Sequence, residues 1–375
     1  MQDLIAFRFM SFKRLLRVFC CSTLLVLATF TTVNAQPFAY VVRQENSNEV
    51  VVIDTSTNSI VTTIPSGGQG SFRTDSNPNG AFVYVTNIAS NDVSVIDTAT
   101  NTVVTTIPVG PFPLDVAFTP DGSFAYVTNP GSNSVVVIDA ATHTVVDTLP
   151  LQFPNVVAVS PDGEFAYVTT FTNGGAAVGT VAVISTDTNT VIDTIVIGGE
   201  PQGVAFSPTQ NIAYVTDILG ARVFVIDTAS HSVITTVPVG LFPVSIVFTP
   251  NGAFAYVVNG GSRTVSVIRT ADNTVIATIP VGVDAFGIAI TPDGEFVYVT
   301  NLPERTVSVI STDTNTVVDT IFVGGPSLLG DITIAPPASP TSIDQCKKGG
   351  YLKFKNPAFK NQGQCVKFVN ERLHR

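Results

Sequence analysis

The stretch Phe82-Val83-Tyr84-Val85-Thr86-Asn87 recurs along the chain, and this recurrence decides the fold. Related stretches surround six other tyrosines, at intervals of 41 to 47 residues: Tyr40, Tyr126, Tyr167, Tyr214, Tyr256 and Tyr298. Of the eight tyrosines, only Tyr351 lies outside this series. A fixed period of this size is typical of proteins built from one repeated structural unit. We therefore expect most of the 375 residues to form a single repeat domain.

One repeat, starting at Asp115, predicts four short strands. Valine, threonine and aromatic residues, which favour strands, are concentrated at 115–119, 123–128, 134–139 and 144–149. The segments between them are rich in Asn, Gly, Pro, Asp and Thr, and Pro120-Asp121-Gly122 has the composition of a tight turn. No segment has the apolar period of a helix, so a sheet of alternating strands and helices is excluded.

The tyrosine strand and the strand after it are apolar on both faces. In 123–128, Phe, Tyr and Thr point one way, while Ala and Val point the other way. A sheet with one solvent-exposed face would alternate apolar with polar residues. Four-stranded units of about 42 residues that are buried on both sides predict the blades of a β-propeller.

The number of strands predicts how the ring closes. The chain after the leader opens with the tyrosine strand at Phe38, so its first unit lacks the preceding strand. A matching strand, Asp331-Ile332-Thr333-Ile334-Ala335, occurs at the far end with no tyrosine strand after it. We therefore predict an all-β, seven-bladed propeller of four-stranded blades over residues 36–335. Pairing of strand 331–335 with the first blade closes the ring and covers an exposed edge.

The repeat resembles a known family. Tyr-Val-Thr-Asn stands at 84–87, 126–129 and 298–301, and Val-Ile-Asp-Thr at 95–98 and 225–228, with Pro-Asp-Gly turns between strands. These motifs resemble the YVTN family of seven-bladed propellers, which occur in bacterial and archaeal secreted and surface-layer proteins. The resemblance covers residues 38–335. It implies the propeller fold, but it implies little about function because propellers carry many activities.

The N-terminus predicts export. Lys13, Arg14 and Arg17 precede an apolar stretch at 18–30, and Val33-Asn34-Ala35 offers small residues for cleavage. This order is typical of a secretory signal peptide over residues 1–35. The mature protein is then periplasmic, cell-surface or secreted. An uncleaved membrane anchor is the alternative, and Met10 is an alternative start.

The C-terminus predicts a small basic module. Residues 336–343 form a Pro/Ser linker, and 344–375 contain Cys346 and Cys365. An even pair of cysteines in an exported chain suggests a disulfide, which would stabilise this loop by about 3 kcal/mol; two free thiols are the alternative. The segment resembles a Cys-pair module at the C-termini of some bacterial exported proteins, for which no activity is implied.

Charge is distributed unevenly. Residues 36–340 carry a net charge of −19, whereas 341–375 carry +6. The acidic body argues against nucleic acid as a partner. The basic tail is expected to contact anionic cell-envelope polymers or lipid headgroups, to dock on the acidic propeller, or simply to remain solvated. A monomer is expected.

Residues for catalysis or cofactor binding are scarce. His143 and His231 occupy a turn position that is Asn in other repeats, and His374 is near the end of the chain. No CxxCH or HExxH motif is present, and tryptophan is absent. We therefore expect no catalytic residues, no cofactor and no metal site. A feature shared by most blades is expected to be structural, so we assign one strand-end position to turn capping: Asp54, Asp97, Asp139 and Asp227.

Departures from the repeat are better candidates for function. Arg73-Thr74-Asp75-Ser76 is polar where other inner strands are apolar, and Arg73 and Asp75 share a face of that strand. They could pair near the central channel, or this blade could merely fit poorly. An insertion at 172–177 is a second departure, and a surface loop without function is the alternative there.

The inner strands are expected to surround one mouth of the channel, which is the default ligand site of such a fold. The predicted ligand-binding residues are mostly uncharged: Phe72, Arg73, Asp75, Asp115, Asn155, Gln202, Ser245, Phe286 and Asp331. This composition favours binding of a small ligand or a protein over acid–base catalysis.

The sequence favours an exported, non-catalytic binding or surface-scaffold protein. One alternative is a propeller enzyme of the lactonase or lyase type. A second is an accessory protein in periplasmic redox metabolism, since the repeat also resembles the propeller subunits of amine dehydrogenases.

Overall fold

The computed structural model describes residues 37–44, 48–170, 178–325, 328–337 and 365–367. The predicted leader, the insertion at 172–177 and most of the linker and the C-terminal module, including Cys346, lie outside these residues. The described part contains 28 strands in seven four-stranded antiparallel sheets. Residues 365–367 form a single helical turn.

The sheets are the predicted blades, which we number 1 to 7 along the chain. Within each blade the strands follow one another from the inner edge of the sheet to its outer edge. Blade 1 has β28 (Leu329–Ala335), β1 (Phe38–Arg43), β2 (Glu49–Asp54) and β3 (Ser59–Pro65); blade 2 has β4 (Ser71–Ser76), β5 (Phe82–Asn87), β6 (Asp92–Asp97) and β7 (Thr102–Pro108); blade 3 has β8 (Asp115–Phe118), β9 (Phe124–Asn129), β10 (Ser134–Asp139) and β11 (Thr144–Pro150); blade 4 has β12 (Pro154–Val159), β13 (Phe165–Thr170), β14 (Thr180–Ser185) and β15 (Thr190–Val196).

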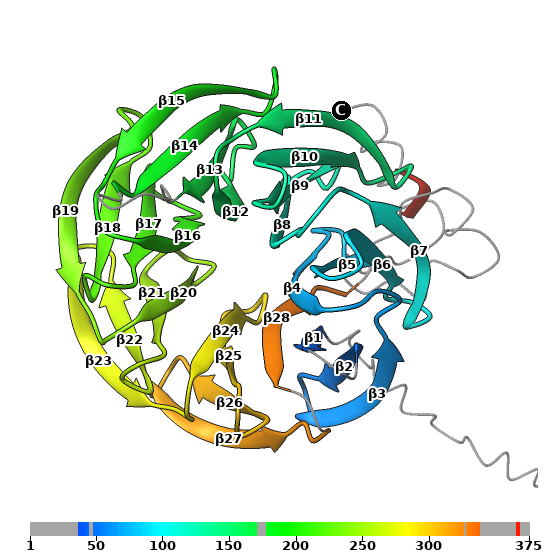
Figure 1. The fold of residues 1–375 in the computed structure, drawn as a ribbon. Coiled ribbons are helices and arrows are strands. Elements are labelled where there is room, and N and C mark those ends of the chain that lie inside the picture. Colours follow the sequence, from blue (N-terminus) through cyan, green and yellow to red (C-terminus); the bar gives the residue numbers. More distant parts are fainter. Residues whose placement is uncertain (1–36, 45–47, 171–177, 326–327, 338–364, 368–375) are drawn as a thin grey trace, which may run out of the picture. The chain divides into compact units, whose positions relative to one another are not determined.

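The remaining three blades repeat this order. Blade 5 has β16 (Pro201–Phe206), β17 (Ile212–Asp217), β18 (Arg222–Asp227) and β19 (Ser232–Pro238); blade 6 has β20 (Pro243–Phe248), β21 (Phe254–Asn259), β22 (Thr264–Arg269) and β23 (Thr274–Pro280); blade 7 has β24 (Ala285–Ile290), β25 (Phe296–Asn301), β26 (Thr306–Ser311) and β27 (Thr316–Phe322). The seven blades form a ring, with the inner strands around its centre (Figure 1).

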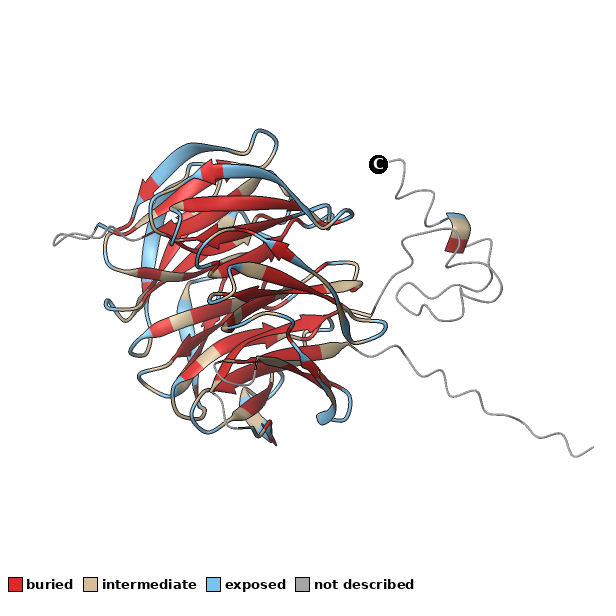
Figure 2. Ribbon diagram, turned by 45° about the vertical axis from the view of Figure 1, so that its right-hand side comes forward, coloured by how far each residue is buried: buried red, intermediate tan, exposed pale blue. Residues whose placement is uncertain are grey.

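The hydrophobic core lies between blades rather than in one central mass. Seven clusters of buried side chains each join two neighbouring blades. The cluster between blades 7 and 1, for example, packs Ala39 and Val41 against Tyr298 and Val309. Buried residues therefore run through the middle strands, while the outer strands are largely exposed (Figure 2). This explains why the middle strands are apolar on both faces.

The tyrosine of the repeat connects each blade to the next. The hydroxyl of Tyr40 donates a hydrogen bond to the Asn101 side chain at 2.8 Å, and Tyr298 of the last blade donates to Asn58 of the first at 2.6 Å. Asn101 and Asn58 both adopt a left-handed backbone conformation at their turns, which Asn tolerates well. The tyrosines are among the largest fully buried side chains, so this bond satisfies a polar group inside the core.

The ring closes as predicted. Strand β28 pairs antiparallel with β1, with Phe38 opposite Ala335 and Val41 opposite Ile332, and a register shift near Arg43. The Arg43 guanidinium donates to Glu49 of the same blade at 2.8 Å, and it also donates to the carbonyl of Val323 in the connection from blade 7. The far end of the chain thus supplies the inner strand of blade 1.

The predicted turn caps are confirmed. The Asp97 carboxylate accepts backbone hydrogen bonds from Ala99 and Thr100, and Asp139 accepts them from Ala141 and Thr142. Within the described residues, no helix is long and apolar enough to cross a membrane.

Candidate functional site

All seven inner strands contribute to a cavity of about 410 Å³ in the centre of the ring. Its charged residues come from three adjacent blades, whereas apolar residues come from every blade except the second. The strands of blades 1, 2 and 3 supply the charged residues: Arg73, Asp75, Asp115 and Asp331. The strands of blades 5, 6 and 7 supply apolar side chains, together with one hydroxyl: Val204, Ser245, Ile246, Val247, Ile288, Ala289 and Ile290.

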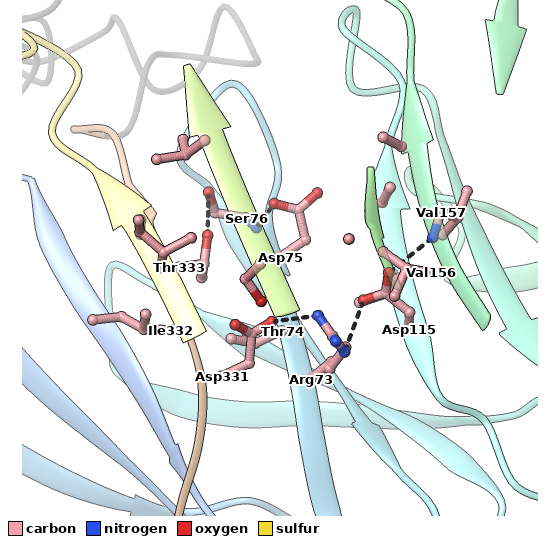
Figure 3. Close-up of a pocket in the computed structure, with 18 of the residues that line it drawn as sticks. Arg73, Thr74, Asp75, Ser76, Asp115, Val156, Val157, Asp331, Ile332 and Thr333 are labelled. Atoms are coloured by element: carbon pink, nitrogen blue, oxygen red, sulfur yellow. Dashed lines mark hydrogen bonds and ion pairs between the residues drawn. The ribbon is translucent and has the colours of Figure 1, made fainter. Parts of the chain in front are cut away.

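Arg73 lies between two carboxylates from the neighbouring blades (Figure 3). Its Nε is 4.0 Å from Oδ1 of Asp115, and its Nη1 is 4.0 Å from Oδ2 of Asp331. Both separations exceed a hydrogen bond, and the buried Nε has no hydrogen-bond partner. The guanidinium also lies 5.1 Å from the centre of the Phe286 ring. Arg73 is therefore held loosely by charge, and its donors are not fully used.

The three carboxylates also contact the backbone of the next blade. Asp75 Oδ2 accepts a hydrogen bond from the Phe118 backbone N–H at 2.9 Å, and Asp115 Oδ2 accepts one from Val157 at 2.9 Å. The backbone of Thr74 donates to Asp331 in the same way. Each carboxylate thus joins two blades. Because an ionised carboxylate can accept about four hydrogen bonds, capacity for a ligand is left over.

Burial raises the pKa of these three carboxyl groups. Desolvation, reinforced by the nearby charges of Asp115 and Asp331, raises the pKa of Asp75 to about 7. Desolvation also raises the pKa of Asp331 to about 6, although the Arg73 charge opposes the rise. The pKa of Asp115 is raised by burial and lowered in part by Arg73. Since nearby Arg73 offsets the charge of two acids and not of the third, Asp75 lacks a cation.

The predicted site residues do not all lie in the cavity. Arg73, Asp75, Asp115, Ser245 and Asp331 line it. The other four predicted residues are not among its lining residues: Phe72, Asn155, Gln202 and Phe286.

These four residues make two pairs at the entry ends of the inner strands. Phe72 and Phe286 pack with ring centres 5.8 Å apart, and the Asn155 amide donates to Gln202 Oε1 at 3.1 Å. The backbone of Phe72 also packs closely on Gly330, where an added Cβ would be 2.7 Å from the Phe72 carbonyl. The charged cluster therefore lies deeper in the channel than the predicted mouth.

The expected pairing of Arg73 with Asp75 along one strand is not what the structure has. The ion pairs of Arg73 run to Asp115 and Asp331 on the neighbouring blades. A register irregularity between Ser71 and Thr74 changes how this strand meets β5. Arg73 thus forms its ion pairs with residues of the neighbouring blades and not with a residue of its own strand.

The sequence also missed the apolar half of the lining. Ile246 and Ile288 fit the ordinary pattern of the repeat, so they carried no signal of their own. Only the closed ring brings them into one cavity with the charged residues.

His143 and His231 belong to the blade contacts and not to the channel. Nδ1 of His143 pairs with the hydroxyl of Tyr84 at 2.8 Å, and Nδ1 of His231 with that of Tyr167 at 2.7 Å. They take the part that Asn plays in the other blades, in agreement with the turn assignment. No group of three or more His, Cys, Asp or Glu suited to a metal ion occurs in the described part of the chain.

One family model matches part of the chain. The model of the cytochrome D1 heme domain matches residues 29–170, which is well under half of the sequence. The matched segment includes Arg73, Asp75 and Asp115. The comparison with curated proteins gave no significant match.

Solved structures share the fold. Hydrazine synthase of Kuenenia stuttgartiensis superposes with a TM-score of 0.65 at 22% identity, covering 76% of this chain and 99% of that one. A functionally unknown protein of Desulfotomaculum acetoxidans gives 0.69 at 20% identity, covering 80% and 99%. The dihydro-heme d1 dehydrogenase NirN gives 0.58 at 14% identity, covering 80% and 75%. At these identities the likeness establishes the propeller fold alone.

The heme-domain match corrects the function expected from the sequence. A non-catalytic binding or surface-scaffold protein is the wrong assignment, because the matched family model is that of a haem-binding propeller domain. The alternative that placed the chain in redox metabolism agrees better with this match. The expectation was argued from absent residue types, and their absence does not exclude a place in redox metabolism.

The channel does not fit a haem held by an axial side chain. Haem iron in proteins takes His, Cys, Met or Tyr as its axial ligand. Among the described residues that line the cavity, none is of these four types. The described histidines and the repeat tyrosines are used between blades. Three carboxylates would also repel the acidic groups of a tetrapyrrole. We therefore assign no haem chemistry to this cavity.

Proposed function

We propose that this chain is an exported accessory propeller of redox metabolism, which works with a haem-bearing or electron-transfer protein and uses its central channel as a ligand site. The match of the cytochrome D1 heme domain to residues 29–170 carries the proposal. Two of the similar structures come from proteins named as a hydrazine synthase and a dihydro-heme d1 dehydrogenase, which agrees with such a context.

The assignment as an accessory protein follows from the channel. A propeller that held haem itself would need an axial ligand at its centre, and this channel offers carboxylates, one guanidinium and apolar side chains instead. We infer that the haem or other redox centre belongs to a partner protein.

Three further predictions belong to this proposal. Export follows from the predicted leader at 1–35, and membership of the YVTN family from the motifs at 84–87, 126–129 and 298–301. The basic tail, 341–375, supplies positive charge for contact with anionic cell-envelope polymers.

Purification of the tagged full chain from the exported fraction of its source organism tests the function. We expect a haem-staining or flavin-containing protein to co-purify in stoichiometric amount, and the complex to show the absorbance of that partner. The same purification from an untagged strain is the control. A complex without any redox cofactor, combined with unchanged oxidoreductase activity in a deletion strain, would overturn the proposal.

Titration of the isolated full chain with haemin tests the accessory assignment separately. We expect the absorbance to remain that of unbound haemin, since the channel lacks an axial ligand. A stable shift of the haem absorbance that is lost on substitution of a channel residue would show that the chain binds haem itself.

A further inference from the structure

We propose that the central channel binds a small organic cation with a hydrocarbon part, of the alkylammonium class, with its charged end at Asp75. This inference rests on the proposed function in that it names the ligand of the same channel. It is argued from charge, from a polar group without a partner and from the apolar residues that line the same cavity.

Charge favours a cation. The charged groups that line the cavity are Arg73 on β4, Asp75 on β4, Asp115 on β8 and Asp331 on β28. With all three acids ionised, one guanidinium faces three carboxylates, and the low dielectric of the channel strengthens their field. The two Arg73 ion pairs involve Asp115 and Asp331, so Asp75 is the carboxylate without a cation.

Two buried polar groups of the cavity have no hydrogen-bond partner within the protein. The Ser245 side chain lines the cavity and is 7% exposed, yet its hydroxyl has no hydrogen-bond partner. The Arg73 Nε also lacks a partner, but it is a donor and an ammonium group has no acceptor for it, so this group does not support a cation. Buried polar groups are normally satisfied, and an exception calls for an unseen partner. A ligand in the cavity, with bridging water, would supply one.

The apolar lining selects a ligand with a hydrocarbon part. Ile246, Ile288 and Ile290 of blades 6 and 7 line the cavity, and so do apolar residues of the strands that carry the carboxylates, such as Val116 and Ile332. A bare inorganic cation would leave this surface wet, whereas an alkyl chain would bury it. Each buried methylene contributes about 0.8 kcal/mol to transfer from water, equivalent to roughly a fourfold gain in affinity.

Asp75 is also reachable. Along the inner strands, several lining residues near the C-terminal ends are partly accessible to solvent: Asp75, Ser76, Ala158, Val159, Val247 and Ile290. Asp75 accepts hydrogen bonds from the backbone of Ser76 at 2.8 Å and of Phe118 at 2.9 Å, which fixes the carboxylate in place. Each oxygen keeps a further lone pair for an ammonium group.

A structural role alone is the competing explanation. The three carboxylates join adjacent blades through backbone hydrogen bonds, and this by itself would be sufficient reason for their presence. It leaves the unpaired charge of Asp75 without a reason. The experiment must therefore separate binding from blade contacts.

Calorimetric titration of the full purified chain with n-butylammonium, n-butanol and butyrate tests the site. We expect butylammonium to bind, and the two ligands that lack the positive charge to bind at least tenfold more weakly. Along the series of methyl-, ethyl-, propyl- and butylammonium, affinity should rise about fourfold per methylene. These comparisons use the unaltered protein, so they do not depend on whether a variant folds.

Proton release gives a second readout that a structural role would not produce. The pKa of Asp75 is raised to about 7, and an ammonium group binds only its ionised form. An alkylammonium with a pKa near that of lysine, about 10.4, stays charged throughout. Binding should therefore release close to one proton at pH 6 and little at pH 8, and affinity should be about tenfold lower at pH 6 than at pH 8.

Substitution locates the ligand. Asp75→Asn should weaken butylammonium about 10- to 100-fold, the range for losing a hydrogen bond to a charged group, and should abolish the proton release. Asp147→Asn makes the same chemical change on the exposed outer strand β11 and should leave affinity unaltered. If Asp75→Asn fails to fold, the chain-length series and the proton release still test the proposal, because both use the unaltered protein.

Equal binding of butanol and butylammonium, tighter binding of butyrate, or no binding of any of the three would overturn the proposal. Butyrate bound more tightly would assign the site to Arg73 and to an anion. Loss of the amine site would leave the redox assignment standing if a redox partner still co-purifies. Conversely, amine binding without such a partner would overturn the redox assignment alone.

Discussion

At the scale of single residues, two hydroxyl-bearing residues of the repeat hold neighbouring blades together. The hydroxyl of Tyr84 meets His143 of the next blade, and that of Thr86 donates to the Leu114 carbonyl, also in the next blade. Thr128 and Thr300 make the equivalent bond to the carbonyls of Asn155 and Gly330. The tyrosine is present in every blade and the threonine in five of the seven, since Val42 and Val258 replace it in blades 1 and 6.

Replacement of His143 tests this contact at a residue. Burial lowers the pKa of His143, so the folded protein binds this proton less tightly than the unfolded chain. Its contribution to stability is therefore complete at pH 7 and is lost as the pH falls below the unfolded pKa of about 6.5. Protonated Nδ1 cannot accept from the Tyr84 hydroxyl, whereas Asn can at any pH.

We expect His143→Asn to match the native protein within about 0.5 kcal/mol at pH 7 and to be more stable by about 0.5–1.5 kcal/mol at pH 5. Denaturant unfolding of both proteins at the two pH values measures this. The double variant Tyr84→Phe, His143→Asn is the control. Because it lacks the tyrosine hydroxyl, its free energy of unfolding at pH 5 should not exceed that of the native protein. If the free energies of unfolding of His143→Asn and the native protein differ by the same amount at pH 5 and at pH 7, His143 does not act as an acceptor.

At the scale of elements, strand β28 determines whether the ring is complete. It pairs with β1 and lies between β4 and β24, and it supplies Asp331 to the channel. Ile332 and Ile334 pack in the cluster between blades 7 and 1. Without β28, one edge of β1 would expose unpaired backbone groups.

Two truncations test the closure. A chain that ends after residue 325 lacks β28, and we expect it to lose cooperative unfolding and to aggregate, because the edge of β1 and the cluster around Ile332 become exposed. A chain that ends after residue 337 retains β28, and it should unfold with the midpoint of the full protein within a few degrees. Thermal unfolding followed by circular dichroism compares the two. Similar behaviour of both chains would refute closure by β28.

At the scale of the whole molecule, closing the ring gathers charges from three blades into one channel. Asp331 comes from the end of the propeller, Arg73 and Asp75 from blade 2 and Asp115 from blade 3. Burial raises the pKa of all three acids, to about 7 for Asp75 and about 6 for Asp331. The folded protein therefore holds protons that the unfolded chain releases near pH 4.

This arrangement predicts that stability falls as the pH rises from 5 to 8. Raised pKa values stabilise the folded state below the unfolded pKa, and this stabilisation is lost as the pH passes through the folded values near 6 and 7. We expect the melting temperature to fall by about 5 °C over this range. The carboxyl groups of Asp139 and Asp272 have lowered pKa values, so their contribution to stability changes below pH 5 and does not alter the trend between pH 5 and pH 8.

Differential scanning calorimetry from pH 5 to pH 8 measures the fall. Asp75→Asn should flatten the curve, since a neutral amide carries no charge into the channel. The exposed substitution Asp147→Asn should leave the slope as it is. A melting temperature that rises steadily from pH 5 to pH 8 in the native protein would contradict the raised pKa values.

The repeat, the strand order, the number of blades and the closure by the C-terminal strand could all be predicted from the sequence. These depend on apolar periodicity and turn residues within each repeat, which are local properties of the chain. The sequence also pointed to Arg73, Asp75, Asp115 and Asp331, since each places a charge in the inner strand of its blade.

The tertiary structure alone decided how these charges meet. Arg73 lies between Asp115 and Asp331 rather than beside Asp75, because inner strands of neighbouring blades face one another around the ring. It also placed Ser245, Ile246 and Ile288 in the same cavity, and it left Phe72 and Phe286 outside the residues that line it. Distances across a closed ring depend on all seven blades at once, so no single repeat contains them.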